Sequence, residues 1–79
     1  MVQLMPTRTK PSRFVTVTVT HEGISYEAIL SRALGRVQLR RDGSNVGSCE
    51  WAGSLIGSFA ADVPEGVYDL VEQALAAAV

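Results

Sequence analysis

The fold is decided by residues 14–20, which read Phe-Val-Thr-Val-Thr-Val-Thr. This strict alternation of β-branched residues predicts a half-buried β-strand, because successive side chains of a strand point to opposite faces. Val15, Val17 and Val19 share one face, which we expect to pack on the core, and the threonines share the other. A strand of this kind needs further strands beside it and a cover over its apolar face, because a lone hairpin does not persist in water.

The next segment allows two interpretations. Residues 21–23 (His-Glu-Gly) suit a three-residue hairpin loop, a type I turn followed by a left-handed glycine. Residues 24–30 then alternate as a second strand. The apolar residues of 26–34 also recur at helical spacing, and Ser25 and Gly35 would cap and end such a helix. The short loop favours the strand, and the helix remains the alternative.

A second hairpin is expected from residues 36–51. Val37 and Leu39 alternate with polar residues, which predicts a strand with a basic wet face. Residues 42–45 (Asp-Gly-Ser-Asn) predict a turn, and 46–51 return as the partner strand. A glycine-rich segment follows, in which the expected core contributors are Leu55, Ile56 and Phe59.

The end of the chain predicts an amphipathic helix. Asp62 can accept from the first backbone N–H groups, Glu65 completes a capping box, and Pro64 is tolerated in the first turn. One apolar stripe follows, made of Val67, Leu70, Val71, Ala74, Leu75 and Ala78. The predicted fold class is therefore α+β, a small antiparallel β-meander of three or four strands packed by one C-terminal amphipathic helix. It occupies residues 13–79, and residues 1–12 are predicted to be a flexible basic N-terminal arm.

Charge is segregated along the chain. All seven basic side chains lie in the first 41 residues, and the last 38 residues carry six carboxylates with no Lys or Arg. The net charge of −1 hides this separation. A surface of one sign attracts partners of the other sign, so the pattern points to binding.

Composition bounds the class of protein. Cys49 is the single cysteine, so no intramolecular disulfide forms and a reducing compartment, the cytoplasm, is expected. The N-terminal residues lack a signal-peptide pattern, and no run of 18 apolar residues predicts a membrane span. The small core of a 79-residue chain gains from a partner, either a second copy or another protein.

Nothing in the chain predicts catalysis. His21, the only histidine, is expected to be a solvated turn residue, and Cys49 a small buried apolar one. The ligand spacings of known metal sites and the phosphate-binding glycine motifs are absent, so we expect no catalytic, cofactor-binding or metal-binding residues.

Protein binding through an acidic surface is the leading interpretation. It assigns partner binding to Glu50, Asp62, Glu65, Tyr68, Asp69 and Glu72. A negative patch of this kind docks on a basic groove, including one built to hold nucleic acid. Two alternatives stay open. In the first, the carboxylates serve only to keep the outer helix face soluble or to pair with arginines of the sheet. In the second, the arginine-bearing sheet and the arm bind nucleic acid directly.

The order of several short motifs resembles small anti-CRISPR proteins of phages and prophages. These motifs are Ser12-Arg13, the Val-Thr strand to Thr20, Tyr26-Glu27, Arg41-Asp42-Gly43, Val46-Gly47, Ala52-Gly53-Ser54 and the alanine-rich helix. The resemblance implies a non-enzymatic inhibitor or adaptor that binds a CRISPR effector complex and blocks DNA recognition, here through the acidic surface. It transfers no individual functional residue.

Overall fold

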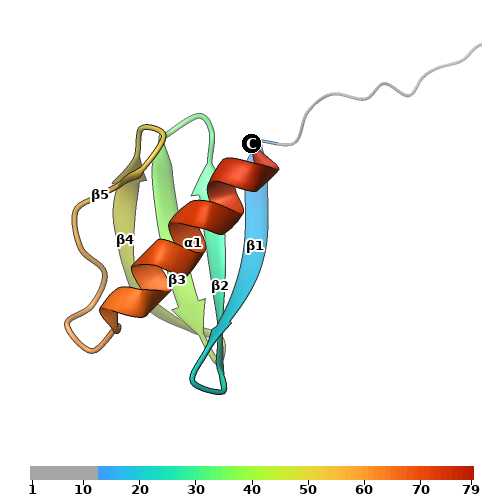
Figure 1. Cartoon of the computed structure of the whole chain (residues 1–79). Coiled ribbons are helices and arrows are strands. Elements are labelled where there is room, and N and C mark those ends of the chain that lie inside the picture. The colour runs from blue at the N-terminus through green and yellow to red at the C-terminus, as the bar shows by residue number, and fades with distance from the viewer. Residues whose placement is uncertain (1–12) are drawn as a thin grey trace, which may run out of the picture.

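A computed structural model describes residues 13–79, which form one curled antiparallel sheet with a helix across it (Figure 1). The strands follow each other in the order β1-β2-β3-β4-β5, so each one pairs with its neighbour in the chain. Their bounds are Phe14–His21 for β1, Ile24–Ser31 for β2, Arg36–Arg41 for β3, Ser44–Trp51 for β4 and Leu55–Ile56 for β5. The helix α1 spans Glu65–Ala78. The predicted α+β class and the meander with one C-terminal helix are confirmed.

The first hairpin shows why the alternating stretch decides the fold. Val15, Val17 and Val19 pack against the core, while the threonines between them are exposed. The loop is shorter than the three residues expected, because His21 pairs with Ile24. Glu22 takes a positive φ of 51° as well as Gly23 at 79°, which makes a two-residue type I′ turn. This turn matches the twist of the flanking strands, whereas the expected type I turn would need an extra residue.

Residues 24–31 form a strand, so the helical alternative is wrong. Tyr26, Ala28 and Leu30 alternate into the core, which satisfies the period of two. Leu34, which the helical spacing placed on the apolar stripe, is 74% exposed in the turn before β3. Pairing with strands on both sides decided the outcome for a segment whose sequence fits either period.

The second hairpin confirms the expected strand pair. Its turn is narrower than 42–45, because Arg41 pairs with Ser44 and only Asp42 and Gly43 lie between them. Both take positive φ values, of 52° and 77°, as a type I′ turn requires. A register shift between Gln38 and Arg40 bends the sheet at this point.

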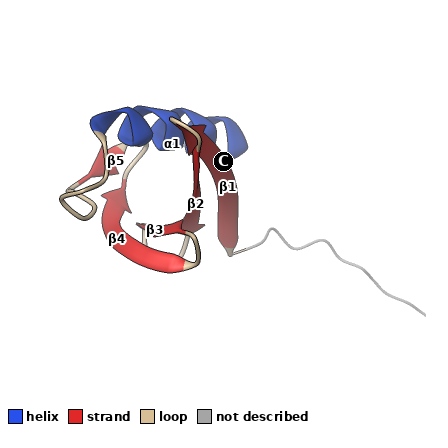
Figure 2. Cartoon of the chain, turned by 90° about the horizontal axis from the view of Figure 1, so that it is seen from below, coloured by secondary structure: helices blue, strands red, loops and turns tan. Residues whose placement is uncertain are grey.

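The sheet has a fifth strand, one more than the three or four expected. The two residues of β5 return beside the end of β4, and the sheet curls so that β1 and β5 lie near opposite edges of the helix (Figure 2). Leu55 packs on the core and Phe59 is buried, as expected. Ile56 is 51% exposed, so its predicted place in the core is wrong; it lies opposite Glu50 on the outer face.

The helix α1 closes the inner face, packing mainly against β1. Val67, Val71 and Leu75 are fully buried, which confirms the central part of the apolar stripe, while Ala78 is exposed at its end. Its first turn lies against the end of β1, where a Cβ on Gly66 would come within 2.5 Å of His21 Nε2.

The predicted capping box is wrong. The helix begins at Glu65, its N-cap is Pro64, and no side chain caps it. Asp62 instead accepts a hydrogen bond from Arg41 Nη2 at 2.7 Å. A cationic partner holds the carboxylate better than neutral N–H groups do, because charge-assisted hydrogen bonds are the stronger ones.

The predicted basic arm, residues 1–12, lies outside the described part of the chain. Within residues 13–79, no helix has both the length and the apolar character needed to cross a membrane.

Candidate functional site

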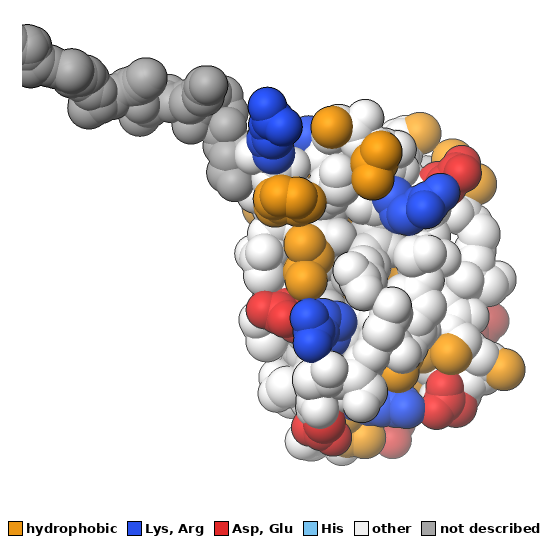
Figure 3. Space-filling model, turned by 180° about the vertical axis from the view of Figure 1, so that it is seen from behind, with side chains coloured by type: hydrophobic (Ala, Val, Ile, Leu, Met, Phe, Trp, Pro, Cys, Tyr) orange, Lys and Arg blue, Asp and Glu red, His pale blue; other side chains and the backbone are white. Residues whose placement is uncertain are grey.

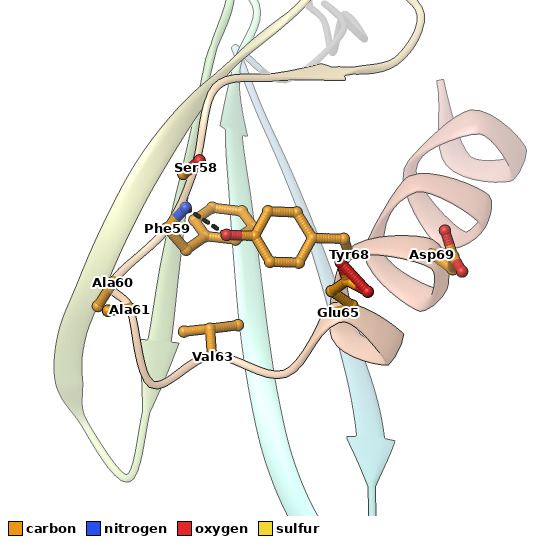
Figure 4. Close-up of a pocket in the computed structure, with 8 residues that line it drawn as sticks. All are labelled: Ser58, Phe59, Ala60, Ala61, Val63, Glu65, Tyr68 and Asp69. Carbon is orange, nitrogen blue, oxygen red and sulfur yellow. Dashed lines mark hydrogen bonds between the residues drawn. The ribbon is translucent and has the colours of Figure 1, made fainter.

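A pocket opens between the first turns of α1 and the segment that leads from β5 into the helix (Figure 4). It has a volume of about 520 Å³. Its lining consists of Ser58, Phe59, Ala60, Ala61, Val63, Glu65, Tyr68 and Asp69. We call this the acidic pocket, because two of its lining residues are carboxylates and none is Lys or Arg.

Tyr68 and Phe59 hold the two sides of the acidic pocket together. The Phe59 backbone N–H donates to the Tyr68 hydroxyl oxygen at 2.7 Å, and the ring centroids are 5.0 Å apart with the planes tilted by 43°. Figure 4 shows Tyr68 extending from α1 across to the loop, with this hydrogen bond at its tip. The bond gives the Phe59 backbone N–H an acceptor, and it places two aromatic rings in the wall.

Three carboxylates follow one edge of α1. Glu65, Asp69 and Glu72 stand at positions i, i+4 and i+7, which share a helix face. Glu65 and Asp69 line the acidic pocket, and Asp69 and Glu72 line a second hollow together with Gly53. We call these three residues the acidic stripe. Glu65 lies in the first turn, where a negative charge is favoured by the helix dipole.

The other two carboxylates assigned to partner binding lie elsewhere. The Arg41 guanidinium neutralises Asp62 through an ion pair of 2.7 Å, and this hydrogen bond and charge lower the pKa of the Asp62 carboxyl. Glu50 is on the outer face of the sheet, opposite Arg36 in the register of β3 and β4. Four of the six predicted residues therefore gather at α1, namely Glu65, Tyr68, Asp69 and Glu72.

The outer face of the sheet mixes charges of both signs. Arg36 lies opposite Glu50 and Arg40 lies opposite Glu27. Figure 3 shows basic and acidic side chains side by side over this face, with apolar ones between them. This arrangement weakens the positive field that the clustering of arginines in the sequence suggested.

The two residues considered for catalysis, Cys49 and His21, are both withdrawn at least in part from solvent. Cys49 is buried, as predicted, and its burial raises the pKa of the thiol, which disfavours the nucleophilic thiolate. His21 is half-buried against Gly66 rather than fully solvated. No group of three or more His, Cys, Asp or Glu side chains within the described range is placed to hold a metal ion.

Sequence reasoning missed the wall of the acidic pocket. Phe59 and Val63 were visible only as apolar residues in and beside a small-residue segment, and nothing in their spacing indicated a contact with Tyr68. The connection from β5 crosses to the helix and brings them together. Comparisons with protein-family models, with curated proteins and with solved structures found no match to this chain.

Proposed function

We propose that the protein is a non-enzymatic binding module, an inhibitor or adaptor, that docks on a basic surface of another protein through the acidic pocket and the acidic stripe. One observation carries the proposal. The pocket combines two aromatic rings with the carboxylates Glu65 and Asp69, and its lining contains no cation to neutralise them.

This chemistry suits a Lys or Arg side chain of the partner. The aliphatic stem of such a side chain packs on apolar surface, and its charged head stays near carboxylates and water. The half-buried Tyr68 ring, packed on the buried Phe59, provides the apolar wall, and aromatic faces attract cations by about 0.5–1 kcal/mol at exposed sites. Glu65 and Asp69 provide the acceptors at the rim.

The acidic stripe extends this recognition beyond one side chain. A single exposed ion pair contributes only about 0–1 kcal/mol, so one contact is too weak to hold a partner. Glu72 continues the line of carboxylates past the pocket along α1. A partner with several basic side chains would engage the whole stripe, and its association would be fast and sensitive to salt.

Basic grooves of this kind are common in complexes that handle nucleic acid. The resemblance to small anti-CRISPR proteins makes the DNA path of a CRISPR effector complex the first partner to test. In this role the acidic stripe would occupy the place of DNA phosphates, and the protein would block DNA recognition.

The test neutralises the stripe without changing side-chain size. The variant Glu65→Gln/Asp69→Asn/Glu72→Gln is compared with a control of the same charge change, Glu22→Gln/Glu27→Gln/Glu50→Gln. The probes are a fluorescent arginine-rich peptide and purified CRISPR effector complexes challenged with target DNA. We expect the stripe variant to lose binding and inhibition while the control retains both.

Equal losses in the two folded variants would show that net charge alone matters, and no loss in the stripe variant would refute the assignment. The alternative of direct nucleic-acid binding through the arginine-bearing sheet and arm predicts a salt-sensitive gel shift. Because the sheet arginines Arg36 and Arg40 lie opposite carboxylates, we expect no shift at micromolar protein in low salt.

A further inference from the structure

The strand β1 forms one edge of the sheet. Within residues 13–79 it pairs with β2 alone, and no strand lies along its other side. The opposite end of the sheet carries β5 and the acidic pocket, so this edge is separate from the surface proposed above.

The hydrogen bonding of the first hairpin determines which backbone groups point outward. Arg32 N–H donates to Arg13 O at 2.9 Å, which makes Arg13 and Arg32 a hydrogen-bonded pair. Bonded and non-bonded pairs alternate along an antiparallel ladder. Counting along the register, the bonded residues of β1 are the odd-numbered ones up to His21. The N–H and C=O groups of Thr16, Thr18 and Thr20 therefore point away from β2.

The sequence of this edge strand lacks the features that usually prevent pairing. Natural edge strands carry Lys, Pro or a bulge, or are very short. Residues 14–20 contain no charged residue and no proline, and their register with β2 runs without a shift over all eight residues of β1. An exposed strand of this length and composition is built to pair with another strand.

We infer that the occupant is β1 of a second copy, paired antiparallel about a two-fold axis at Val17. In this register Thr16 lies opposite Thr18 of the second copy. Thr16 N–H donates to that Thr18 O, and the Thr18 N–H donates back to Thr16 O. The two-fold axis repeats both hydrogen bonds between Thr18 of the first copy and Thr16 of the second. The sheets of the two copies then form one continuous sheet.

The side chains favour self-pairing on both faces. On the inner face, Val17 meets Val17 and Val15 meets Val19, so valines that are half-exposed in one chain gain cover. On the outer face, Thr16 meets Thr18, a favourable cross-strand pair, and Phe14 meets Thr20. No like charges oppose each other between 14 and 20, and the net charge of −1 per chain adds little repulsion. A strand without charges has nothing with which to select a charged peptide instead.

Sedimentation of the full chain over a dilution series tests the inference, with a dimer expected at twice the mass of the 8.5 kDa chain. The variant Thr16→Lys/Thr18→Lys sets like charges opposite each other twice, and we expect dimerisation weaker by about tenfold or more. The variant Thr16→Lys/Thr18→Glu sets opposite charges there and stays dimeric. The control Ser44→Lys/Ser48→Lys adds the same charge on β4 and also stays dimeric.

Cross-linking tests the register. Val17→Cys places two thiols on a non-hydrogen-bonded pair, whose Cα separation of about 4.5 Å fits a disulfide. We expect the Val17→Cys variant to form this cross-link on oxidation. The Val19→Cys variant should not, because residue 19 would lie opposite Val15 of the second copy. A wild-type chain that stays monomeric at every concentration would overturn the inference. Equal dimerisation of the Lys/Lys and Lys/Glu variants would overturn the edge and register assigned here.

Discussion

Gly47 is the position where the structure makes its sharpest prediction about stability. It forms a bridge with Phe59, at the point where the chain passes from β5 to the helix. Its φ is +113°, and a Cβ would lie 2.7 Å from Ala60 N and 2.9 Å from Phe59 Cα. These are backbone atoms, which cannot rotate away as a side chain does. The change to test is Gly47→Ala.

The cost of Gly47→Ala has three parts. The positive φ costs an L-residue about 1–2 kcal/mol. Relieving the overlap costs about 1–3 kcal/mol, as overpacking does in cores. Moving Ala60 weakens its N–H bond to Val46 O, which is 2.8 Å long, and a typical hydrogen bond contributes about 1 kcal/mol net. The expected loss is about 3–6 kcal/mol, a large share of the stability of about 4–12 kcal/mol typical of this size.

Gly53→Ala is the matched control, because Gly53 also has a positive φ, of +84°, but apart from its two chain neighbours no residue comes within 4 Å of its Cβ position. It should lose only the backbone part, about 1–2 kcal/mol. Urea unfolding followed by the fluorescence of Trp51, the single tryptophan, measures both losses. If Gly47→Ala costs no more than Gly53→Ala, the close approach of Phe59 and Ala60 is not what requires glycine at position 47.

Two further predictions concern polar contacts around the acidic pocket. Tyr68→Phe keeps the ring packing but leaves Phe59 N–H without its acceptor, so urea unfolding should show a loss of about 1–2 kcal/mol; an unchanged stability would refute the hydrogen bond. Asp62→Asn removes a carboxyl whose pKa is lowered in the folded state, first by the hydrogen bond from Arg41 and then by its charge. The ion pair therefore stabilises the fold above the unfolded-state pKa of Asp62, and this stabilisation is lost as pH falls through the folded-state pKa. The free energies of unfolding of wild type and variant should differ slightly at neutral pH and become equal in acid. A difference in urea midpoint that is independent of pH would contradict the ion pair.

The local pattern of apolar residues was sufficient to predict an element where it fitted only one type of secondary structure. The alternation over 14–20 and the apolar stripe around Val67 and Val71 each fit one period, and both elements formed as predicted. Residues 24–34 fit two periods, and β-pairing on both sides excluded the helix. The capping box at Asp62 failed for a related reason, because Arg41, which lies 21 residues away in the sequence, is the partner that competes for the carboxylate.

The candidate site also has one part that the sequence predicted and one part that it did not. Glu65, Asp69 and Glu72 were predictable as a group, because the helical repeat places them on one face whatever the rest of the chain does. The pocket was not predictable, because Phe59 reaches Tyr68 only after the sheet has curled and β5 has turned the chain back to the helix.

By itself, then, the sequence determined the period of the first strand, the C-terminal helix, the α+β class and the line of carboxylates, since each depends on residues close together in the chain. Only the tertiary structure decided the fifth strand, the start of the helix, the partner of Asp62, the outward position of Glu50 and the acidic pocket. Each of these depends on which distant segments come into contact, and such contacts are selected by the packing of the whole core rather than by any local preference.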